Sequence, residues 1–440
     1  MKLLLIFATT LTVVLSGTVD PSLKKAVDLG LNTVAILELP QIVGQLETNQ
    51  ALQTLFGDAK VATLVATLKG LTSAAQAPFV SIAASLGLEI EQYWISNVIL
   101  VKGLTLEKLD TLSKTPGEFI LRKQHIVTLD HIRSGREEVA NNFTVRNPQW
   151  GVAKIRAPEA WSLTTGENAV VGFIDTGVNI GHVALSDGFA GAWMDPYYNT
   201  LVPTDVQGHG SFVAGIVVGR ANGIGVAPGA QYIACRGMNN QGSGTEAALI
   251  QCAEFMVTAT PRPQVVPNAW GGVPGAWFEP IISAWRSAGI IPLFAIGNSG
   301  PNCGTISAPG SHGGVIGVAA TSDTDAVATF SSRGPGAGGV LKPDFAAPGA
   351  NILSAGTGAS NYVTMSGNGA GPHTAGAIAL IVSLHPDWGY DEVYNALATS
   401  AAQPPLSDND RACGLPTPGV DYPNYVYGHG RIDVAAALGL

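Results

Sequence analysis

Charged residues are scarce in this chain. They make up 12% of its 440 residues, whereas hydrophobic residues make up 46%. A sequence of this composition and length can build a sizeable core and can hold one large domain plus a smaller one. Basic clusters are absent, and the formal net charge is −9. Both features argue against a nucleic-acid partner, because nucleic-acid binding needs a concentrated positive surface.

The sequence also lacks an apolar run long enough to cross a membrane comfortably. One apolar run, residues 3–15, follows Lys2 and precedes small residues at positions 16–18. This order is typical of a short secretory signal, so we assign residues 1–17 to a signal peptide. A membrane anchor is the alternative interpretation of the same run. The prediction is a secreted, extracellular protein without a membrane partner.

Cysteine is rare, with four residues in the chain, and their spacing is unlike that of a zinc site. Because an exported protein meets oxidising conditions, these cysteines are expected to form disulfides. The preferred pairing joins Cys235 with Cys252 and Cys303 with Cys413, and other connectivities stay open. A single glycosylation sequon begins at Asn142.

The first 130 residues differ in pattern from the rest of the chain. Residues 18–50 carry no strong pattern. The segments that follow predict a helix pair over 51–86, a strand over 93–101, a short helix over 106–112 and a strand over 118–129. Strand, helix and strand in close succession indicate a small α+β domain, which we assign to 18–130. The next residues are polar and charged, so an exposed linker is predicted over 131–147.

From Trp150 onward, short apolar strands alternate with helical stretches. The predicted strands span 169–174, 231–236, 264–267, 291–296 and 314–318, and the predicted helices span 212–218, 245–257 and 280–288. This alternation indicates an α/β domain over 148–440, with a parallel sheet and helices on both faces. In such sheets the chemically active residues lie at the carboxyl ends of the strands.

Three polar residues stand where such chemistry is expected. Asp175 ends an apolar strand, where a carboxylate can orient an imidazole, or where it can simply cap a turn. His209 lies between glycines before an apolar helix, where it can face a cleft or be a buried, hydrogen-bonded side chain. Asn298 follows another apolar strand. Its amide can donate to a developing oxyanion, or it can be a turn residue with positive φ.

A glycine-rich loop, residues 366–373, precedes the apolar run 374–384. The run predicts a long central helix, because its residues are apolar on nearly all sides. Pro372 fits the first helical turn, and the helix is expected to end before Pro386. A helix N-terminus in a core is a good place to stabilise an oxyanion. The position where a nucleophile is expected holds Asn368.

Taken in this order, the motifs resemble the subtilisin-like serine proteases, the subtilase family, and in particular its bacillopeptidase-F-like branch. The resemblance covers the chain from Trp150 to the C-terminus and includes the motifs at 171–177, 208–210, 330–335, 342–349 and 427–433. It implies a subtilisin-like three-layer fold with a mostly parallel central sheet. Residues 51–130 look similar to the family's inhibitory propeptide, a small ferredoxin-like α+β domain that assists folding and caps the cleft.

By position, the resemblance makes Asp175 the orienting acid, His209 the general base and Asn298 the side-chain oxyanion donor. Two edges would clamp the backbone of a bound peptide as an added strand. They are formed by Gly242, Ser243 and Gly244 on one side and by Ala269, Trp270, Gly271 and Gly272 on the other. Ordinary turn chemistry is the alternative for both edges.

The partners implied by the resemblance are an extended peptide or protein in the cleft and the chain's own propeptide. The protein is expected to be a monomer without a cofactor. Structural calcium is common in the family, but no cluster of ligands in this sequence points to a metal site, which stays unassigned.

The family's nucleophile motif, Gly-Thr-Ser-Met-Ala-x-Pro-His, carries its serine where this chain has Asn368. An amide cannot be deprotonated to attack a carbonyl as a serine hydroxyl can. The leading hypothesis is therefore a proteolytically inactive pseudoprotease that binds peptides or proteins. One alternative is an active endopeptidase that uses Ser366, or whose loop the sequence misreports. The second alternative is an inert structural remnant.

Overall fold

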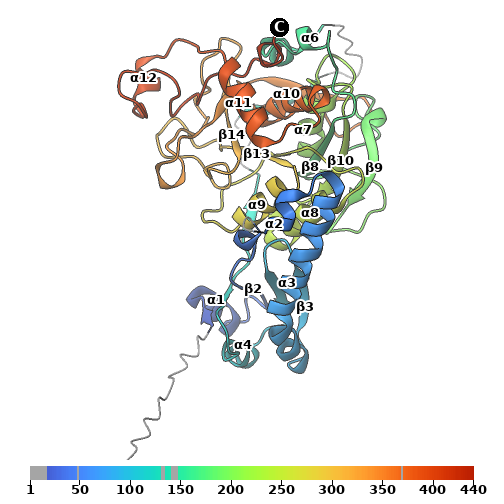
Figure 1. Ribbon diagram of the computed structural model, residues 1–440, viewed down its shortest axis with the longest axis vertical. Coiled ribbons are helices and arrows are strands. Elements are labelled where there is room, and N and C mark those ends of the chain that lie inside the picture. The colour runs from blue at the N-terminus through green and yellow to red at the C-terminus, as the bar shows by residue number, and fades with distance from the viewer. Residues whose placement is uncertain (1–16, 47–48, 130–133, 140–146, 368–369) are drawn as a thin grey trace, which may run out of the picture. The chain divides into compact units, whose positions relative to one another are not determined.

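The computed structural model describes residues 17–46, 49–129, 134–139, 147–367 and 370–440 (Figure 1). The chain divides into two compact units, one of Met1–Thr48 and Ala66–Gln124 and the other of Asn49–Val65 and His125–Leu440. The predicted signal peptide up to residue 16 and the sequon at Asn142 lie outside the described residues. None of the described helices has the length and apolar character that a membrane crossing requires.

The smaller unit is built on a five-stranded sheet with the strand order β1-β5-β2-β4-β3. Its strands are β1 (Thr18–Val19), β2 (Val34–Glu38), β3 (Glu89–Tyr93), β4 (Val98–Lys102) and β5 (Ile120–Arg122), and its helices are α1 (Pro21–Asp28), most of α3 (Gly57–Ser85) and α4 (Leu106–Ser113). From β2 onward the elements follow the β-α-β-β-α-β order of ferredoxin-like folds. This confirms the predicted small α+β fold, and it shows that residues 18–38, where the sequence has no clear pattern, form β1, α1 and β2.

One predicted strand of this unit, residues 93–101, is wrong in its extent. β3 ends at Tyr93 and β4 begins at Val98, so the residues between them form the turn of a hairpin. Asn97 adopts a φ of 40°, a left-handed conformation that asparagine tolerates. Its buried side chain donates to Pro40 O at 2.8 Å and accepts from Gln76 Nε2 at 3.2 Å. These contacts hold the turn, and no apolar pattern encodes them.

The larger unit contains a seven-stranded sheet with the order β15-β14-β13-β12-β8-β10-β9, in which all neighbouring pairs are parallel. The strands are β8 (Val170–Asp175), β9 (Phe189–Met194), β10 (Gln231–Arg236), β12 (Val265–Asn268), β13 (Ile291–Ala295), β14 (Ile316–Thr321) and β15 (Phe345–Pro348). The five predicted parallel strands are confirmed. The two strands missed lie at the sheet edges, where β9 is half-exposed and β15 is only four residues long.

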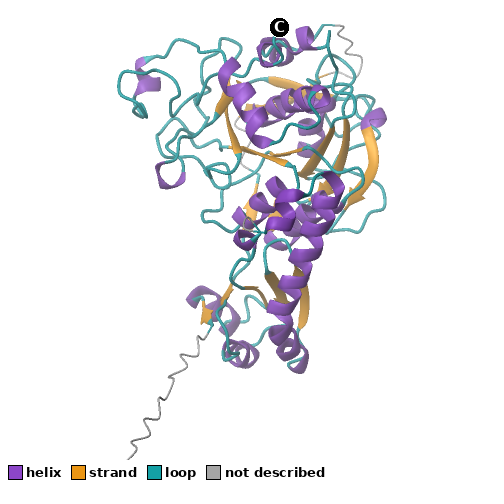
Figure 2. Ribbon diagram, in the orientation of Figure 1, coloured by secondary structure: helices purple, strands orange, loops and turns teal. Residues whose placement is uncertain are grey.

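Helices cover both faces of this sheet, which gives the predicted three-layer α/β fold (Figure 2). The helices are α2 (Gln50–Thr54), α5 (Trp150–Lys154), α6 (Ala157–Ala160), α7 (His209–Val218), α8 (Glu246–Thr258), α9 (Glu279–Ser287), α10 (Ala370–Leu384), α11 (Tyr390–Ser400), α12 (Asp408–Arg411) and α13 (Val434–Ala437). α10 packs against α7 and against β12, β13, β14 and β15, whereas α8 packs against α9, β8 and β10. α10 is buried from Ala370 to Val382, as expected for a helix that is apolar on all sides.

Two small sheets complete the larger unit. β11 (Ser243–Thr245) pairs with β6 (Ile126–Thr128), and β17 (Tyr362–Ser366) lies between β16 (Ile352–Ala355) and β7 (Ser134–Val139). Residues 118–129 therefore do not form one strand, because β5 and β6 belong to different units. The predicted linker also contains a strand, β7. Its charged sequence gives no period-two pattern, and only the pairing with β17 makes it a strand.

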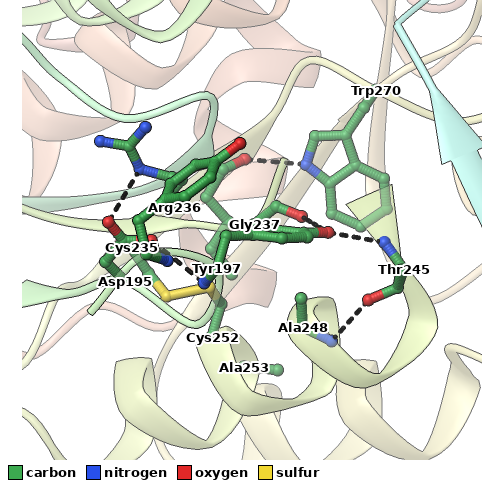
Figure 3. The surroundings of a disulfide bond; sticks show 12 residues. Asp195, Tyr197, Cys235, Arg236, Gly237, Thr245, Ala248, Cys252, Ala253 and Trp270 are labelled. Carbon is green, nitrogen blue, oxygen red and sulfur yellow. Dashed lines mark hydrogen bonds and ion pairs between the residues drawn. A yellow bond between two sulfur atoms is a disulfide. The ribbon is translucent and has the colours of Figure 1, made fainter. Parts of the chain in front are cut away.

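Both disulfides have the preferred connectivity. Cys235 of β10 pairs with Cys252 of α8, as Figure 3 shows, and Cys303 pairs with Cys413. The two bonds join residues 17 and 110 positions apart. In the chain-entropy account of disulfides, the longer loop removes more freedom from the unfolded chain. The second bond therefore contributes more through this effect.

Gly376 in α10 offers a test of this packing. An alanine Cβ there would lie 2.4 Å from Cβ of Val226, an atom that no rotamer change can move away. Gly376→Ala is expected to lower the free energy of unfolding by about 1–3 kcal/mol, although alanine is the better helix former by about 1 kcal/mol. Gly70→Ala in α3 is the control, because nothing lies within 4 Å of the new Cβ. It should be neutral or stabilising. Urea unfolding of the full chain measures both, and equal effects would contradict close packing at Gly376.

Candidate active site

Asp175 and His209 meet at the carboxyl edge of the parallel sheet. Asp175 is the last residue of β8, and His209 is the first residue of α7. His209 Nδ1 lies 2.8 Å from Asp175 Oδ1, which also accepts the backbone N–H of Thr176 at 2.8 Å. Both side chains are buried. A carboxylate in this position fixes the orientation of the imidazole ring and leaves Nε2 as the atom that can act as a base.

Glycines allow α7 to begin this close to β8. Gly208, the residue before the helix, has a φ of 95°. A Cβ on Gly210 would lie 2.0 Å from Gly177 O, and the backbone N–H of Gly210 donates to Thr176 Oγ1 at 2.9 Å. A larger residue at position 210 would push the helix start away from Asp175. The glycines around His209 therefore have a local structural cause.

A second buried carboxylate, Asp205, organises the same helix start. It accepts hydrogen bonds from Thr176 Oγ1, Gly208 N, Ser211 N and Ser211 Oγ, at 2.7–2.9 Å. Burial raises the pKa of Asp205, and these hydrogen bonds oppose that rise. Asp205 was not predicted as a site residue from the sequence. Its signal is an acidic residue three positions before Gly208 at a predicted helix start, which is typical of capping.

Burial disfavours the protonated form of His209. The negative charges of Asp175 and Asp205 and the hydrogen bond to Asp175 act in the other direction and outweigh it, so the pKa of His209 lies above its ordinary value. Asp175 Oδ2 is buried without a hydrogen-bond partner in the described part of the chain. The Asp175–His209 pair is thus built to stabilise an imidazolium, which is what a general base becomes during proton abstraction.

Asn298 lies beside Gly367, the residue that precedes Asn368 in the sequence. It follows β13 and is 6% exposed. A Cβ on Gly367 would lie 3.3 Å from Asn298 Nδ2, so the amide faces the residue directly before Asn368. Asn368 itself lies outside the described residues, and α10 begins shortly after it, at Ala370. The amide of Asn298 therefore lies beside Gly367, and α10 begins at Ala370, so both adjoin the described residues that flank positions 368 and 369 in the sequence.

Ser366, the alternative nucleophile, is the last residue of β17 and is buried. Its Oγ accepts the backbone N–H of Asn351 at 2.8 Å and donates to Asn351 Oδ1 at 3.2 Å. These two contacts use the hydroxyl both as an acceptor and as a donor. No pattern in the sequence indicates that Asn351 forms hydrogen bonds with Ser366.

The two predicted peptide-binding edges both contact residues 126–129 of the chain itself. β6 pairs antiparallel with β11, so Thr128 lies opposite Ser243, and Leu129 N donates to Gly242 O at 2.9 Å. Thr128 also forms an antiparallel bridge with Gly271. Both edges therefore bind the backbone of an extended segment in the way that an added β-strand is bound.

The side chains of Tyr197 and Trp270 anchor these edges (Figure 3). Tyr197 Oη accepts the backbone N–H of Thr245 at 2.8 Å and lies 3.4 Å from Ser243 O. Burial raises the pKa of Tyr197, so its hydroxyl stays protonated and can donate. On the other edge, Trp270 Nε1 donates to Ile174 O at 2.8 Å, next to Asp175. The second edge is thus held next to Asp175, whereas the first edge is held by Tyr197.

A cavity of about 590 Å³ opens beside Gly272, the last residue of the second edge. Ser307, Ala308, Glu279 and His312 contribute to its lining, and His312 Nδ1 lies 2.6 Å from Glu279 Oε1. A cavity of this size next to a strand-binding edge is large enough to take a side chain of a bound polypeptide.

Across the described residues, no group of three or more His, Cys, Asp or Glu side chains is arranged to hold a metal ion. The side chains present therefore do not form a carboxylate cage of the kind that calcium favours.

Comparison with known proteins gives one family for this arrangement. The profile of the subtilase family matches residues 166–430. Bacillopeptidase F of Bacillus subtilis (strain 168) is 33% identical over 326 residues, which cover 66% of this chain and 22% of that protein. Serine protease AprX of the same organism is 35% identical over 272 residues, 53% of this chain and 61% of that protein. An alkaline protease of Alkalihalobacillus alcalophilus is 31% identical over 304 residues, 67% of this chain and 76% of that protein. The alignment with bacillopeptidase F thus spans only about a fifth of that relative's length.

The pKa of His209 can be tested by removing the charge beside it. Asp175→Asn is expected to lower the pKa of His209. Burial lowers this pKa, and in the variant the negative charge of Asp175 no longer raises it. A raised folded-state pKa stabilises the fold below the unfolded value of about 6.5, and this contribution is lost as the pH rises through the folded-state value. The wild type should therefore exceed the variant in free energy of unfolding most at acidic pH, and the difference should shrink at alkaline pH.

Histidine NMR titration and urea unfolding between about pH 5 and pH 9 measure both effects. Asp187→Asn is the control, since Asp187 is exposed and has no contact with His209 among the hydrogen bonds of the described structure. An unchanged pKa of His209 in Asp175→Asn would contradict the proposed electrostatics.

Proposed function

The chain belongs to the subtilase family of subtilisin-like serine endopeptidases, and from this premise we propose that it is a secreted pseudoprotease that binds extended polypeptide without cleaving it. The observation that carries the proposal is Asn368 at the nucleophile position, next to an otherwise retained site. The hydrogen bond between Asp175 and His209, and the amide of Asn298 beside Gly367, support a role for these three residues in acyl transfer. The group that would form the covalent intermediate is absent from position 368.

The chemical reason is specific to the attacking group. In a subtilisin-type mechanism, His209 would accept the proton of a hydroxyl while that oxygen attacks the peptide carbonyl. The carboxamide of Asn368 has no hydroxyl, and its nitrogen lone pair is delocalised into the carbonyl group. Removing the serine from a subtilisin triad costs about 10⁶-fold in kcat, with about 10³–10⁴-fold left from the oxyanion donors and binding. Asn298 and the start of α10 could supply only the acceleration that remains without the serine, about 10³–10⁴-fold.

The contacts of Ser366 support inactivity rather than substitution by this residue. Its hydroxyl is shared between two atoms of Asn351. It also lies two residues from position 368, which in extended chain corresponds to about 6–7 Å. Attack requires the reacting atoms to approach within about 3–3.5 Å in the right orientation. A rearrangement of β17 would be needed before Ser366 could serve as nucleophile.

The binding half of the proposal rests on backbone pairing. Residues 126–129 are held as a strand by β11 on one side and by Gly271 on the other. We infer that this segment is the C-terminal part of an inhibitory propeptide, residues 18–130, and that it occupies the place of a substrate. Without a nucleophile the chain does not release this segment by its own cleavage. A host protease acting on residues 131–147 would be required to free the edges for another extended polypeptide.

Restoring the missing hydroxyl tests the catalytic half. The wild-type chain, expressed in a protease-deficient host, is expected to remain one polypeptide and to resist labelling by a fluorophosphonate probe. Asn368→Ser should raise the labelling rate by at least about 10³-fold, because the base and oxyanion donors are retained. It should also cleave the chain shortly after Leu129, where the segment held between the two edges ends.

Two matched variants serve as controls for this restoration. Asn368→Ala should stay unlabelled, and His209→Ala in the Asn368→Ser background should abolish the gain. Labelling of the wild type would overturn the inactive assignment. Loss of that label in Ser366→Ala would then identify Ser366 as the nucleophile.

The binding half can be tested by cutting the chain. A recognition site for an added protease, inserted within residues 140–146, converts the protein into two fragments that are expected to co-elute in gel filtration. Leu129→Pro removes the N–H that donates to Gly242 O, and it should weaken retention by about tenfold. Leu129→Ala keeps this donor and isolates the contribution of the side chain. Separation of the wild-type fragments at micromolar concentration would contradict a peptide-binding role.

A further inference from the structure

The strand formed by residues 126–128 meets the start of α8, and the meeting point is Glu246. Glu246 is the first residue of α8 and directly follows β11. Glu246 is only 1% exposed. A carboxylate buried to this degree has to be matched by donors, because leaving an ionised group without partners in a protein interior is costly. One of its donors is the backbone of His125.

Glu246 exchanges two hydrogen bonds with that residue. The backbone N–H of Glu246 donates to His125 O at 2.9 Å, and the backbone N–H of His125 donates to Glu246 Oε2 at 2.9 Å. In an antiparallel ladder, a residue of this kind would receive the second bond on its own carbonyl oxygen. The carbonyl of Glu246 belongs to the first turn of α8, where it points along the helix axis. The carboxylate takes its place.

This substitution lengthens the strand-binding edge. β11 alone pairs with residues 126–128, and Gly242 adds Leu129 at one end. Glu246 adds His125 at the other end, beyond the point where the strand has become a helix. The imidazole of His125 also packs against Trp277, with ring centroids 5.4 Å apart. Position 125 is therefore bound through both its backbone and its ring.

We propose that Glu246 is a positioning residue for an extended polypeptide in this cleft. Its carboxylate accepts a hydrogen bond from the backbone N–H of the residue that occupies the position of His125. The inference rests on the proposed function and adds a preference to it. A bound segment must carry a backbone N–H at this position, so proline is excluded there. A planar side chain at the same position gains the contact with Trp277.

A purely structural role makes a different prediction for the same residue. An acidic side chain in the first turn stabilises a helix through its dipole, whatever lies beside it. In that case Glu246 would act on α8 as Thr245 does, whose Oγ1 caps the helix by accepting Ala248 N at 3.3 Å. Thr245 makes this cap without a side-chain bond to the bound segment. Thr245→Ala is therefore a matched control that weakens the helix start alone.

Amide hydrogen exchange of the full-length chain, resolved over residues 124–129, tests the assignment. Glu246→Ala should lower protection of the His125 amide and of the adjoining strand by about 10- to 100-fold, the usual effect of losing a hydrogen bond to a charged acceptor. Glu246→Gln keeps an acceptor oxygen and should lose less. Thr245→Ala should leave the segment protected. Equal loss in Thr245→Ala and Glu246→Ala, or no loss in Glu246→Ala, would overturn the proposal.

Variants of His125, whose backbone N–H donates to Glu246, give an independent test. His125→Pro removes the N–H and should reduce protection of residues 126–129 as Glu246→Ala does. His125→Ala retains the N–H and should lose less, through the Trp277 contact only. Protection that is the same in His125→Pro and the wild type would also overturn the proposal. Because exchange is read in the intact chain, its outcome does not depend on whether that chain hydrolyses peptides.

Discussion

Parallel pairing in the seven-stranded sheet is the constraint on which the candidate site depends. Parallel strands deliver their carboxyl ends to one edge, and the chain must leave the sheet there in loops. Asp175 ends β8, Asn298 follows β13, and Trp270 follows β12. Residues far apart in sequence are therefore brought to the same edge of the sheet. Their positions follow from the backbone before any side-chain contact forms.

Within that frame, binding and bond cleavage depend on different atoms. The strand-binding edges use backbone N–H and C=O groups of Gly242, Ser243 and Gly271. Every residue type except proline has both groups, so this kind of binding does not depend on a particular side chain. Under the proposed function, hydrolysis would require a side-chain hydroxyl at position 368, where the sequence has asparagine. The edges and the Asp175–His209 hydrogen bond are present in this chain, which has asparagine at that position. A fold of this kind can therefore lose its reaction and keep its capacity to bind extended chain.

Two buried acids, Asp205 and Glu246, accept hydrogen bonds from backbone N–H groups near the site. Each compensates for a backbone group that the fold leaves without a regular partner. Asp205 satisfies N–H groups at the start of α7, and Glu246 satisfies an N–H at the end of a strand. Buried polar groups are stable when they are paired in this way. Both acids thus hold segments in place, one for the base and one for the occupant of the cleft.

Much of the fold was predictable because it depends on local patterns. The apolar runs of β8, β10, β12, β13 and β14 and the all-apolar helix α10 are visible in the sequence, since burial on both faces requires continuous hydrophobicity. The hairpin turn at Asn97 and the charged strand β7 were not predictable in this way. Each is decided by partners distant in sequence, such as Gln76 for the turn and β17 for the strand.

By itself, the sequence determined the fold class, the identities of the acid, base and amide candidates, and the absence of a serine at position 368. These properties reside in residue type and order. Only the tertiary structure decided that Ser366 is engaged by Asn351, that Asp205 supports the base, and that residues 125–129 form the strand held between the two edges. These are pairings between distant segments. Their geometry exists only once the parallel sheet has brought the loops to one edge.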